Sequence, residues 1–222
     1  MIYFCPIYGE LVKYPEDGDI NDSEYWSPRN IRAEVTDQTI IDEWNTVPVP
    51  PAPELKSVAV DPKTSALLIL DMETSICKSP RCMASIPNIH NLLMKARKND
   101  MLVVYSLIPM GNPQDIFKQL APLPGDPIVK SNVDKFYKTN LEEILNEKGI
   151  KTVIITGYAA NGAVLHTATS AAFRGYNVIV PVDCMSANNP YAEQYTAWHM
   201  LNSPGTRNRA VLTKVNLISF SP

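Results

Sequence analysis

Apolar runs, two of which end in Asp, alternate with helix-like segments, and this alternation restricts the fold more than any other feature of the chain. Buried strands are predicted at ALLILD (66–71), MLVVYSLI (101–108), KTVIIT (151–156) and YNVIVPVD (176–183), and a last one at RAVLTKV (209–215). The runs are continuous rather than alternating in polarity, as in strands that are covered on both faces of a parallel sheet.

The segments between these runs have the spacing or the end signals of helices. Helices are predicted at 85–100, 139–149, 161–174 and 190–203, with a short helix at 113–120 and a short extended piece at 126–131. Strand–helix alternation of this kind predicts an α/β fold with a doubly wound, mainly parallel sheet.

In such a sheet the ligand site lies beyond the carboxyl ends of the strands, where the strand order reverses. The sequence places Asp71, residues 105–107, residues 157–163 and Asp183 at these ends. The chain contains neither a GxGxxG nor a GxxxxGK[ST] motif, so no dinucleotide or phosphate loop is predicted, and no cofactor is expected.

Residues 1–62 differ from the rest and are interpreted as an N-terminal arm, with the main domain spanning 63–222. The arm is rich in Pro and acidic residues, and PVPPAP (48–53) is typical of an extended linker. One short helix is predicted within 35–46. The arm carries aromatic side chains, which are uncommon in disordered tails, and is therefore expected to pack on the domain or on a neighbouring subunit: Tyr3, Tyr8, Tyr14, Trp26 and Trp44.

Charge and cysteine content limit the partners and the compartment. The net charge of −3 over 222 residues gives no basic field, which argues against nucleic acid or an anionic membrane as a partner. No apolar stretch approaches the roughly 18 residues of a membrane span, and the N-terminus lacks secretory features. The four cysteines, Cys5, Cys77, Cys82 and Cys184, include no CxxC pair and predict no disulfide scaffold, so a cytoplasmic location is expected.

Three stretches, in this order and spacing, resemble the isochorismatase-like, or cysteine hydrolase, superfamily. They are ALLILDMETS, DPIVKSNVDKFYKTNLEEIL and VIITGYAANGAVLHTATSAAFRGYNVIVPVD, and the resemblance covers roughly residues 60–215. It implies a three-layer α/β/α domain, hydrolysis of a small molecule, and a homo-oligomer, a dimer or a tetramer. Amidase members of the superfamily use a triad of Asp, Lys and Cys.

Matching the motifs implies Asp71 and Lys130 as two catalytic residues and puts Ala163 at the position of the nucleophile. The cis peptide that is common before the nucleophile helix would fall at Tyr158–Ala159. The substrate is expected to contact Tyr158, Ala159, Gly162 and Glu73. On the residues alone, Asp71 could also be a cap after a strand and Lys130 a solvated surface lysine. A carboxylate and an ammonium side by side could exchange a proton with water or substrate.

Other residues offer no clear replacement for the thiol or for a metal site. The segment YSLIPMGNPQ (105–114) lacks the Asp and His ligands of metal-binding members, so no metal is expected. Cys77 enters the pocket on a loop, but nothing positions it at a helix N-terminus. His166 is interpreted as a packed or interfacial residue rather than a group at the pocket rim, and Cys184 as buried and inert.

Ala163 has three interpretations. The chain could be an engineered Cys-to-Ala variant of an amidohydrolase, although Asn161 and Gly162 also depart from the amidase pattern. It could be a thiol-free hydrolase in which Asp71 and Lys130 suffice. Members that cleave isochorismate resemble it here but tend to carry an Arg soon after the Lys, whereas SNVDK (131–135) follows Lys130. It could also be a pseudoenzyme with a binding or scaffold role. The thiol-free hydrolase is the preferred hypothesis, with catalytic competence left open.

Overall fold

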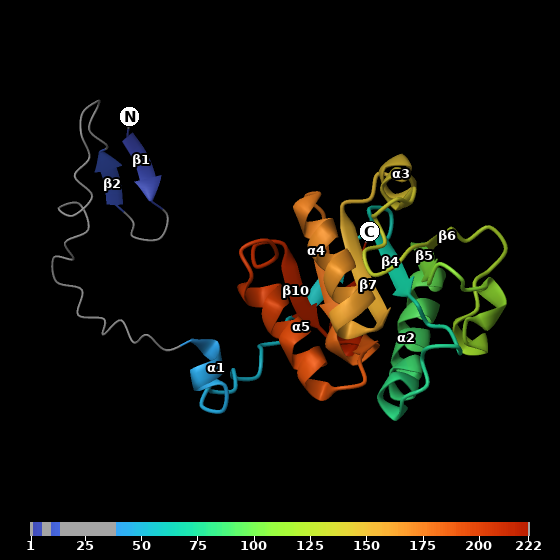
Figure 1. The fold of residues 1–222 in the computed structure, drawn as a ribbon. Helices are drawn as coiled ribbons and strands as arrows, with labels where there is room; N and C mark the ends of the chain where they lie inside the picture. The colour runs from blue at the N-terminus through green and yellow to red at the C-terminus, as the bar shows by residue number, and fades with distance from the viewer. Residues whose placement is uncertain (1, 6–9, 14–38, 222) are drawn as a thin grey trace. The chain divides into compact units, whose positions relative to one another are not determined.

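The computed structural model describes residues 2–5, 10–13 and 39–221 (Figure 1). Its contacts divide the chain into two units, Met1–Val49 and Pro50–Pro222. The strand β3 (Val58–Val60) belongs to the second unit, where it pairs in parallel with β11 (Ile218–Phe220). The domain boundary expected between residues 62 and 63 remains a prediction.

The first unit contains an antiparallel pair, β1 (Ile2–Cys5) and β2 (Glu10–Lys13), and the short helix α1 (Ile40–Glu43). Asp42 accepts hydrogen bonds from the backbone and side chain of Thr39 at the start of α1, which confirms a short helix within 35–46. Trp44 is exposed. Tyr8, Tyr14 and Trp26, which were expected to pack, lie outside the described residues.

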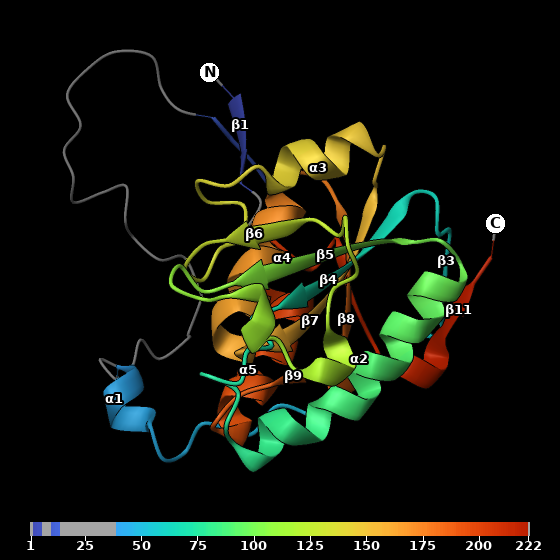
Figure 2. The same cartoon turned by 90° about the vertical axis from the view of Figure 1, so that its right-hand side faces the viewer.

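The second unit is built on a seven-stranded parallel sheet, in which six strands follow the order β10-β8-β7-β4-β5-β6 and β9 pairs with β7 (Figures 1 and 2). Its strands are β4 (Ser65–Leu70), β5 (Leu102–Leu107), β6 (Ile128–Lys130), β7 (Thr152–Tyr158), β8 (Asn177–Pro181), β9 (Met185–Ser186) and β10 (Ala210–Thr213). The order grows outward in both directions from the neighbours β4 and β7, which confirms the doubly wound sheet.

Side chains on the two faces of β4 enter two different cores, because successive residues of a strand point to opposite sides. Leu68 and Leu70 pack with helices α3 (Leu141–Glu147), α4 (Leu165–Phe173) and α5 (Pro190–Asn202). Leu67 and Ile69 pack with α2 (Pro80–Lys98) on the other face. The result is the predicted three-layer α/β/α arrangement, which can be followed in Figure 1.

The two central strands approach each other very closely at their carboxyl ends. Gly157 of β7 pairs with Leu70 of β4, and a Cβ at Gly157 would lie 2.0 Å from the carbonyl oxygen of Leu70. Gly157 also has a φ of 119°, in the region that favours glycine. This glycine therefore allows the two strand ends that carry the candidate site to meet.

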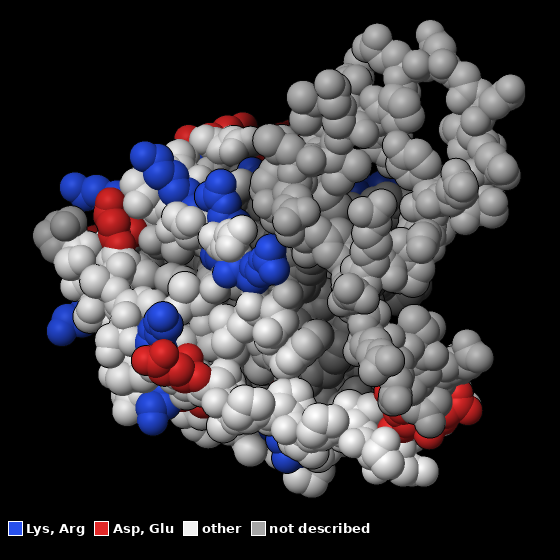
Figure 3. All heavy atoms as spheres, turned by 90° about the vertical axis from the view of Figure 1, so that its left-hand side faces the viewer, with Lys and Arg blue, Asp and Glu red and all other residues white. Residues whose placement is uncertain are grey.

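Charged side chains on the face drawn in Figure 3 lie scattered among uncharged ones, in keeping with the small net charge of the chain. Within the described ranges, no helix is both long enough and apolar enough to cross a bilayer.

Candidate active site

The candidate site lies at the switch in strand order, where β4 and β7 end side by side. Asp71 follows β4 directly, and the segment Tyr158–Val164 ends β7 and leads into α4. Both segments come from buried apolar strands whose parallel pairing fixes their ends at one edge of the sheet. The structure thus brings together two of the three positions singled out in the sequence, Asp71 and the region of Ala163.

Asp71 is held by partners on both carboxylate oxygens. The Ser106 hydroxyl donates to Oδ1 at 2.7 Å, and the Lys135 ammonium lies 2.7 Å from Oδ2. The backbone of Asp71 has a φ of 50°, a left-handed conformation that Asp tolerates better than most residues. The residue is only 5% exposed, so this ion pair is withdrawn from bulk water.

Lys135 is the lysine beside Asp71, so the expectation that Lys130 would lie beside Asp71 is wrong. A catalytic role of Lys130 remains a prediction. Lys130 ends the short strand β6 with an exposed side chain, because the run Ile128–Lys130 alternates between sheet faces. Lys135 is fully buried, and its ammonium also donates to the carbonyl oxygens of Ser131 and Asn132. Its three donors therefore all have acceptors.

Ala163 is joined to this pair through the helix that follows it. The turn Ala160–Val164 is π-helical and runs into α4, in which Thr167 lies one turn after Ala163 on the same face. Thr167 accepts a hydrogen bond from the backbone N–H of Lys135 at 3.2 Å. Ala163 is buried at 3% exposure and presents a methyl group where the family nucleophile would stand.

Burial raises the pKa of Asp71 above its ordinary value, and the charge of Lys135 opposes this rise, as do the hydrogen bonds from Lys135 and Ser106. The pKa of Asp71 is raised on balance because the loss of hydration of its carboxylate outweighs the attraction to the Lys135 ammonium. A carboxyl group with a raised pKa and a fixed cationic neighbour can give up and recover a proton, which is the property required of a general acid or base.

Glu73 is fully buried, and its carboxylate holds the loop that follows β5. Oε2 accepts the backbone N–H of Ile108 at 2.9 Å, while Oε1 has no hydrogen-bond partner among the described residues. A Cβ at Gly111 would lie 1.9 Å from Oε1, so a larger residue at position 111 would have to displace this carboxylate. Burial raises the pKa of Glu73. The predicted contact between Glu73 and a substrate remains a prediction, and the observed contacts are with this loop.

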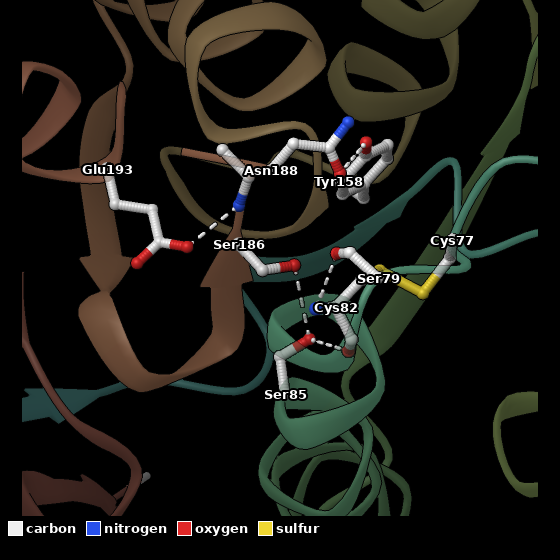
Figure 4. Close-up of a disulfide and its surroundings, with 9 residues drawn as sticks. Cys77, Ser79, Cys82, Ser85, Tyr158, Ser186, Asn188 and Glu193 are labelled. Atoms are coloured by element: carbon white, nitrogen blue, oxygen red, sulfur yellow. Dashed lines mark hydrogen bonds between the residues drawn. A yellow bond between two sulfur atoms is a disulfide. The ribbon is translucent and has the colours of Figure 1, made fainter. Parts of the chain in front are cut away.

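The other three predicted substrate contacts lie along the end of β7. The peptide bond Tyr158–Ala159 is cis, as the resemblance implied. The Tyr158 hydroxyl donates to Oδ1 of Asn188 at 2.9 Å (Figure 4), and Gly162 adopts non-helical dihedral angles inside the π-helical turn. Their contact with a substrate remains a prediction.

Cys77 and Cys82 form a disulfide, which corrects the expectation that the cysteines would stay unpaired (Figure 4). Both residues are buried at the connection between the Asp71 loop and α2. The short spacing escaped notice because it matches no CxxC pattern. Because its sulfur is bonded to that of Cys82, Cys77 is excluded as a relocated nucleophile. The expectation of a reducing, cytoplasmic compartment rested on cysteines without a disulfide, so the cysteines no longer support it.

The remaining candidates take structural or surface positions. Cys184 is buried and free, and burial raises the pKa of its thiol, in agreement with the prediction of an inert residue. His166 is exposed in this chain, with Nδ1 at 2.9 Å from the carbonyl oxygen of Gly162. Asp183 lies in the short turn after β8, which ends at Pro181, and its carboxylate accepts the backbone N–H of Val215.

Sequence reasoning missed the two direct partners of Asp71. Ser106 is the one small polar residue inside the apolar run MLVVYSLI, and that interruption is the signal by which it could have been found. Lys135 precedes a buried aromatic residue, Phe136, whereas Lys130 belongs to a short edge strand. No group of three His, Cys, Asp or Glu side chains with the spacing of a metal site occurs within the described part of the chain.

Comparison with known proteins agrees with this fold. The sequence profile of the Isochorismatase domain family matches residues 65–213. An uncharacterized isochorismatase family protein, YaaI, of Bacillus subtilis is 29% identical over 163 residues, which cover 62% of this chain and 88% of that protein. The secreted isochorismatase effector Isc1 of Verticillium dahliae is 35% identical over 136 residues, covering 54% of this chain and 72% of that protein.

Solved structures show the same fold. The N-carbamoylsarcosine amidase from Thermoplasma acidophilum superposes with a TM-score of 0.60 at 24% identity, over 69% of this chain and 97% of that chain. An isochorismatase family protein from Desulfovibrio vulgaris gives a TM-score of 0.62 at 21% identity, over 69% and 95%. The profile match spans both strands that carry the site and the whole segment between them, so this chain belongs to the isochorismatase family.

Proposed function

We propose that this chain is a hydrolase of small molecules that works without a cysteine nucleophile and moves a proton through Asp71. The observation that carries the proposal is the buried ion pair of Asp71 and Lys135, 2.7 Å apart at the switch in strand order. A buried ion pair contributes little net stability, so its presence at the expected ligand site favours a chemical role.

In the proposed reaction Asp71 is the acid and then the base. For a vinyl ether, the proton leaves Asp71 for an alkene carbon, and water adds to the adjacent oxocarbenium carbon. The water's proton returns to Asp71, and the adduct separates into an alcohol and a carbonyl compound. Lys135 stabilises the carboxylate form between the two transfers, because its charge favours the ionised state. Ala163 forms no covalent intermediate, since a methyl group cannot attack a carbonyl.

The expected substrate class follows from the absence of a cysteine nucleophile at position 163. General acid–base assistance is worth roughly 10²–10⁴-fold. Unactivated amides need more than that, and relatives named as amidases, such as the N-carbamoylsarcosine amidase of an Arthrobacter species, 32% identical over 114 residues, act on amides. We therefore expect activated substrates, such as vinyl ethers or imines, to react in preference to amides.

The test is a panel of vinyl ethers, imines, amides and ureides with the wild-type chain, Asp71→Asn and Lys130→Met. Asn suits the left-handed backbone at position 71, so the first variant keeps the local geometry. We expect turnover of at least one activated substrate, lost by about 10²-fold or more in Asp71→Asn and unchanged in Lys130→Met. Equal turnover in wild type and Asp71→Asn would remove the proposed role of Asp71.

A non-catalytic binding or scaffold protein is the second candidate. Asp71 and Ala163 are only 5% and 3% exposed, which favours it because a substrate must reach both. An inert panel for the wild type, together with an inert Ala163→Cys variant, supports this candidate over the hydrolase.

The same proposal includes a homo-oligomer of at least two chains, with residues 1–49 contributing contacts. Trp44 is 66% exposed, and its neighbours Ile41 and Val49 are 73% and 75% exposed, a large apolar area for a solvated segment. Light scattering should give a mass that is a multiple of 24.7 kDa for the full chain. After deletion of residues 1–49, the number of chains in each particle should be smaller. A monomer that is unaffected by the deletion would contradict the assembly.

A further inference from the structure

Ser106 lies beside Asp71 because of the pairing between β4 and β5. Leu70, the last residue of β4, is in register with Ser106, and the backbone N–H of Asp71 donates to the carbonyl oxygen of Ser106 at 3.2 Å. The side chain of Ser106 is on the face of the sheet opposite to Tyr105, which points into the α2 core. The side chain of Ser106 therefore faces the layer that contains α4 and the turn Ala160–Val164, which carries Ala163.

The hydroxyl of Ser106 contacts the oxygen of Asp71 that Lys135 leaves free. Oγ donates to Oδ1 at 2.7 Å, and Lys135 is bound to Oδ2. Rotation of the carboxylate about its Cβ–Cγ bond would break at least one of these contacts. Ser106 is 1% exposed, so water cannot easily replace its hydroxyl.

We propose that Ser106 is the positioning residue that keeps the carboxyl group of Asp71 in one orientation through a cycle of proton loss and recovery. The role in catalysis rests on the proposed hydrolase function. A hydroxyl both donates and accepts, so Ser106 can donate to the carboxylate and accept from the carboxylic acid. The ammonium of Lys135 only donates, and therefore serves the ionised form alone.

This assignment differs from a role of Ser106 as the replacement nucleophile for the missing thiol. Its hydroxyl hydrogen is committed to Asp71, and the residue sits within the strand rather than at a helix N-terminus. A covalent adduct on Ser106 after treatment with a fluorophosphonate probe, detected by mass spectrometry, would overturn the positioning role.

The decisive measurement is the titration of Asp71 by carbon NMR in protein labelled at the γ-carbon of aspartate. The resonance is identified by its absence in Asp71→Asn. The variants are Ser106→Ala, Ser106→Thr, which restores a hydroxyl, and Ser65→Ala, a buried serine at the opposite end of β4, as the matched control. Glu73 and Lys135, the charged groups that influence Asp71, stay unchanged in all three.

We expect the midpoint of Asp71 to rise by about one pH unit in Ser106→Ala, because a hydrogen bond favours the ionised form more than the neutral one. Ser106→Thr should return toward the wild type, and Ser65→Ala should match it. On any substrate found, Ser106→Ala should lower kcat about tenfold with KM unchanged, since the loss acts on the chemical step.

An unchanged midpoint in Ser106→Ala overturns the inference whatever the substrate panel shows. If Ser106→Ala does not fold, Ser106→Cys, with a weakly donating thiol of similar size, takes its place with the same expected rise. If the Asp71 midpoint shifts but no substrate of the panel reacts, Ser106 remains the residue that orients Asp71 and only the hydrolase activity is rejected. The two failures are therefore distinguishable.

Discussion

The ammonium of Lys135 lies 2.7 Å from Oδ2 of Asp71, with the two side chains 0% and 7% exposed. These residues are far apart in sequence, and they meet because the loop after β6 passes under α4. The Thr167 hydroxyl contacts both the N–H of Lys135 and the carbonyl oxygen of Val133 in this loop. The pair therefore depends on packing between segments that are distant in the chain.

Replacement of Lys135 by Met should destabilise the fold far more than the same replacement of Lys130. Removing one partner of a buried ion pair costs about 3–5 kcal/mol, because the other charge is left without compensation. An exposed lysine such as Lys130 should change stability by no more than about 0.5 kcal/mol. Urea unfolding of both variants at pH 7 measures the difference. Equal effects would contradict the assignment of Lys135 as the partner of Asp71.

The stability gap between wild type and Asp71→Asn should depend on pH. The folded-state pKa of Asp71 is raised above 3.8. At a pH between 3.8 and the folded-state pKa, Asp71 is therefore mostly protonated in the folded chain and mostly ionised in the unfolded chain. The stability of the wild type relative to Asp71→Asn should therefore be greatest below pH 3.8. It should fall as the pH rises through the window between 3.8 and the folded-state pKa. Unfolding curves in steps from about pH 3.5 to 7 would show this, and a gap that widens with pH would have the wrong sign.

Ala163→Cys should install a reactive thiol in the turn that leads into α4. The position is next to the loop that carries Lys135, so a thiolate there would have a cation nearby, which favours ionisation. We expect measurable hydrolysis of amides or ureides by this variant and none by Ala163→Ser, because the serine hydroxyl is much harder to ionise. Mass spectrometry should detect an acyl-enzyme on the introduced thiol under single-turnover conditions.

An Ala163→Cys variant that folds and binds iodoacetamide but hydrolyses no member of the panel would contradict the view that the pocket is an amidase site without its nucleophile. Asp71→Asn in the Ala163→Cys background is the control. Activity that survives this double change would come from elsewhere.

The disulfide between Cys77 and Cys82 gives a distinctive peptide map. Trypsin cuts after Lys78 and Arg81 inside the loop, so unreduced protein should release peptide 64–78 linked to peptide 82–95, without residues 79–81. Closing a loop of this size is worth about 2 kcal/mol. Cys77→Ala/Cys82→Ala should therefore unfold at lower urea than the wild type. Alkylation of both cysteines in unfolded, unreduced protein would exclude the disulfide.

Local patterns in the sequence were sufficient for most strands of the main sheet and for the helices that cover it, and for two positions of the candidate site. A continuous apolar run such as ALLILD becomes a central strand because it is covered on both sides, and its last residue must then lie at the carboxyl edge of the sheet. The same reasoning placed residues 157–163 at the end of another strand on this edge. Both conclusions depend on the pattern of residues within a short segment and on general rules of parallel sheets. Both can therefore be reached from the sequence.

Contacts between distant segments decided the rest. Lys130 and Lys135 are five residues apart in similar surroundings, and only the path of the loop beneath Thr167 places one at Asp71 and the other in solvent. The register between β4 and β5 brings Ser106 to the other carboxylate oxygen, and the turn before α2 brings Cys77 to Cys82. Sequence alone determined which residues could take part in the site. The tertiary structure determined which of them meet, because the distance between two side chains in a folded chain is set by packing rather than by their separation in sequence.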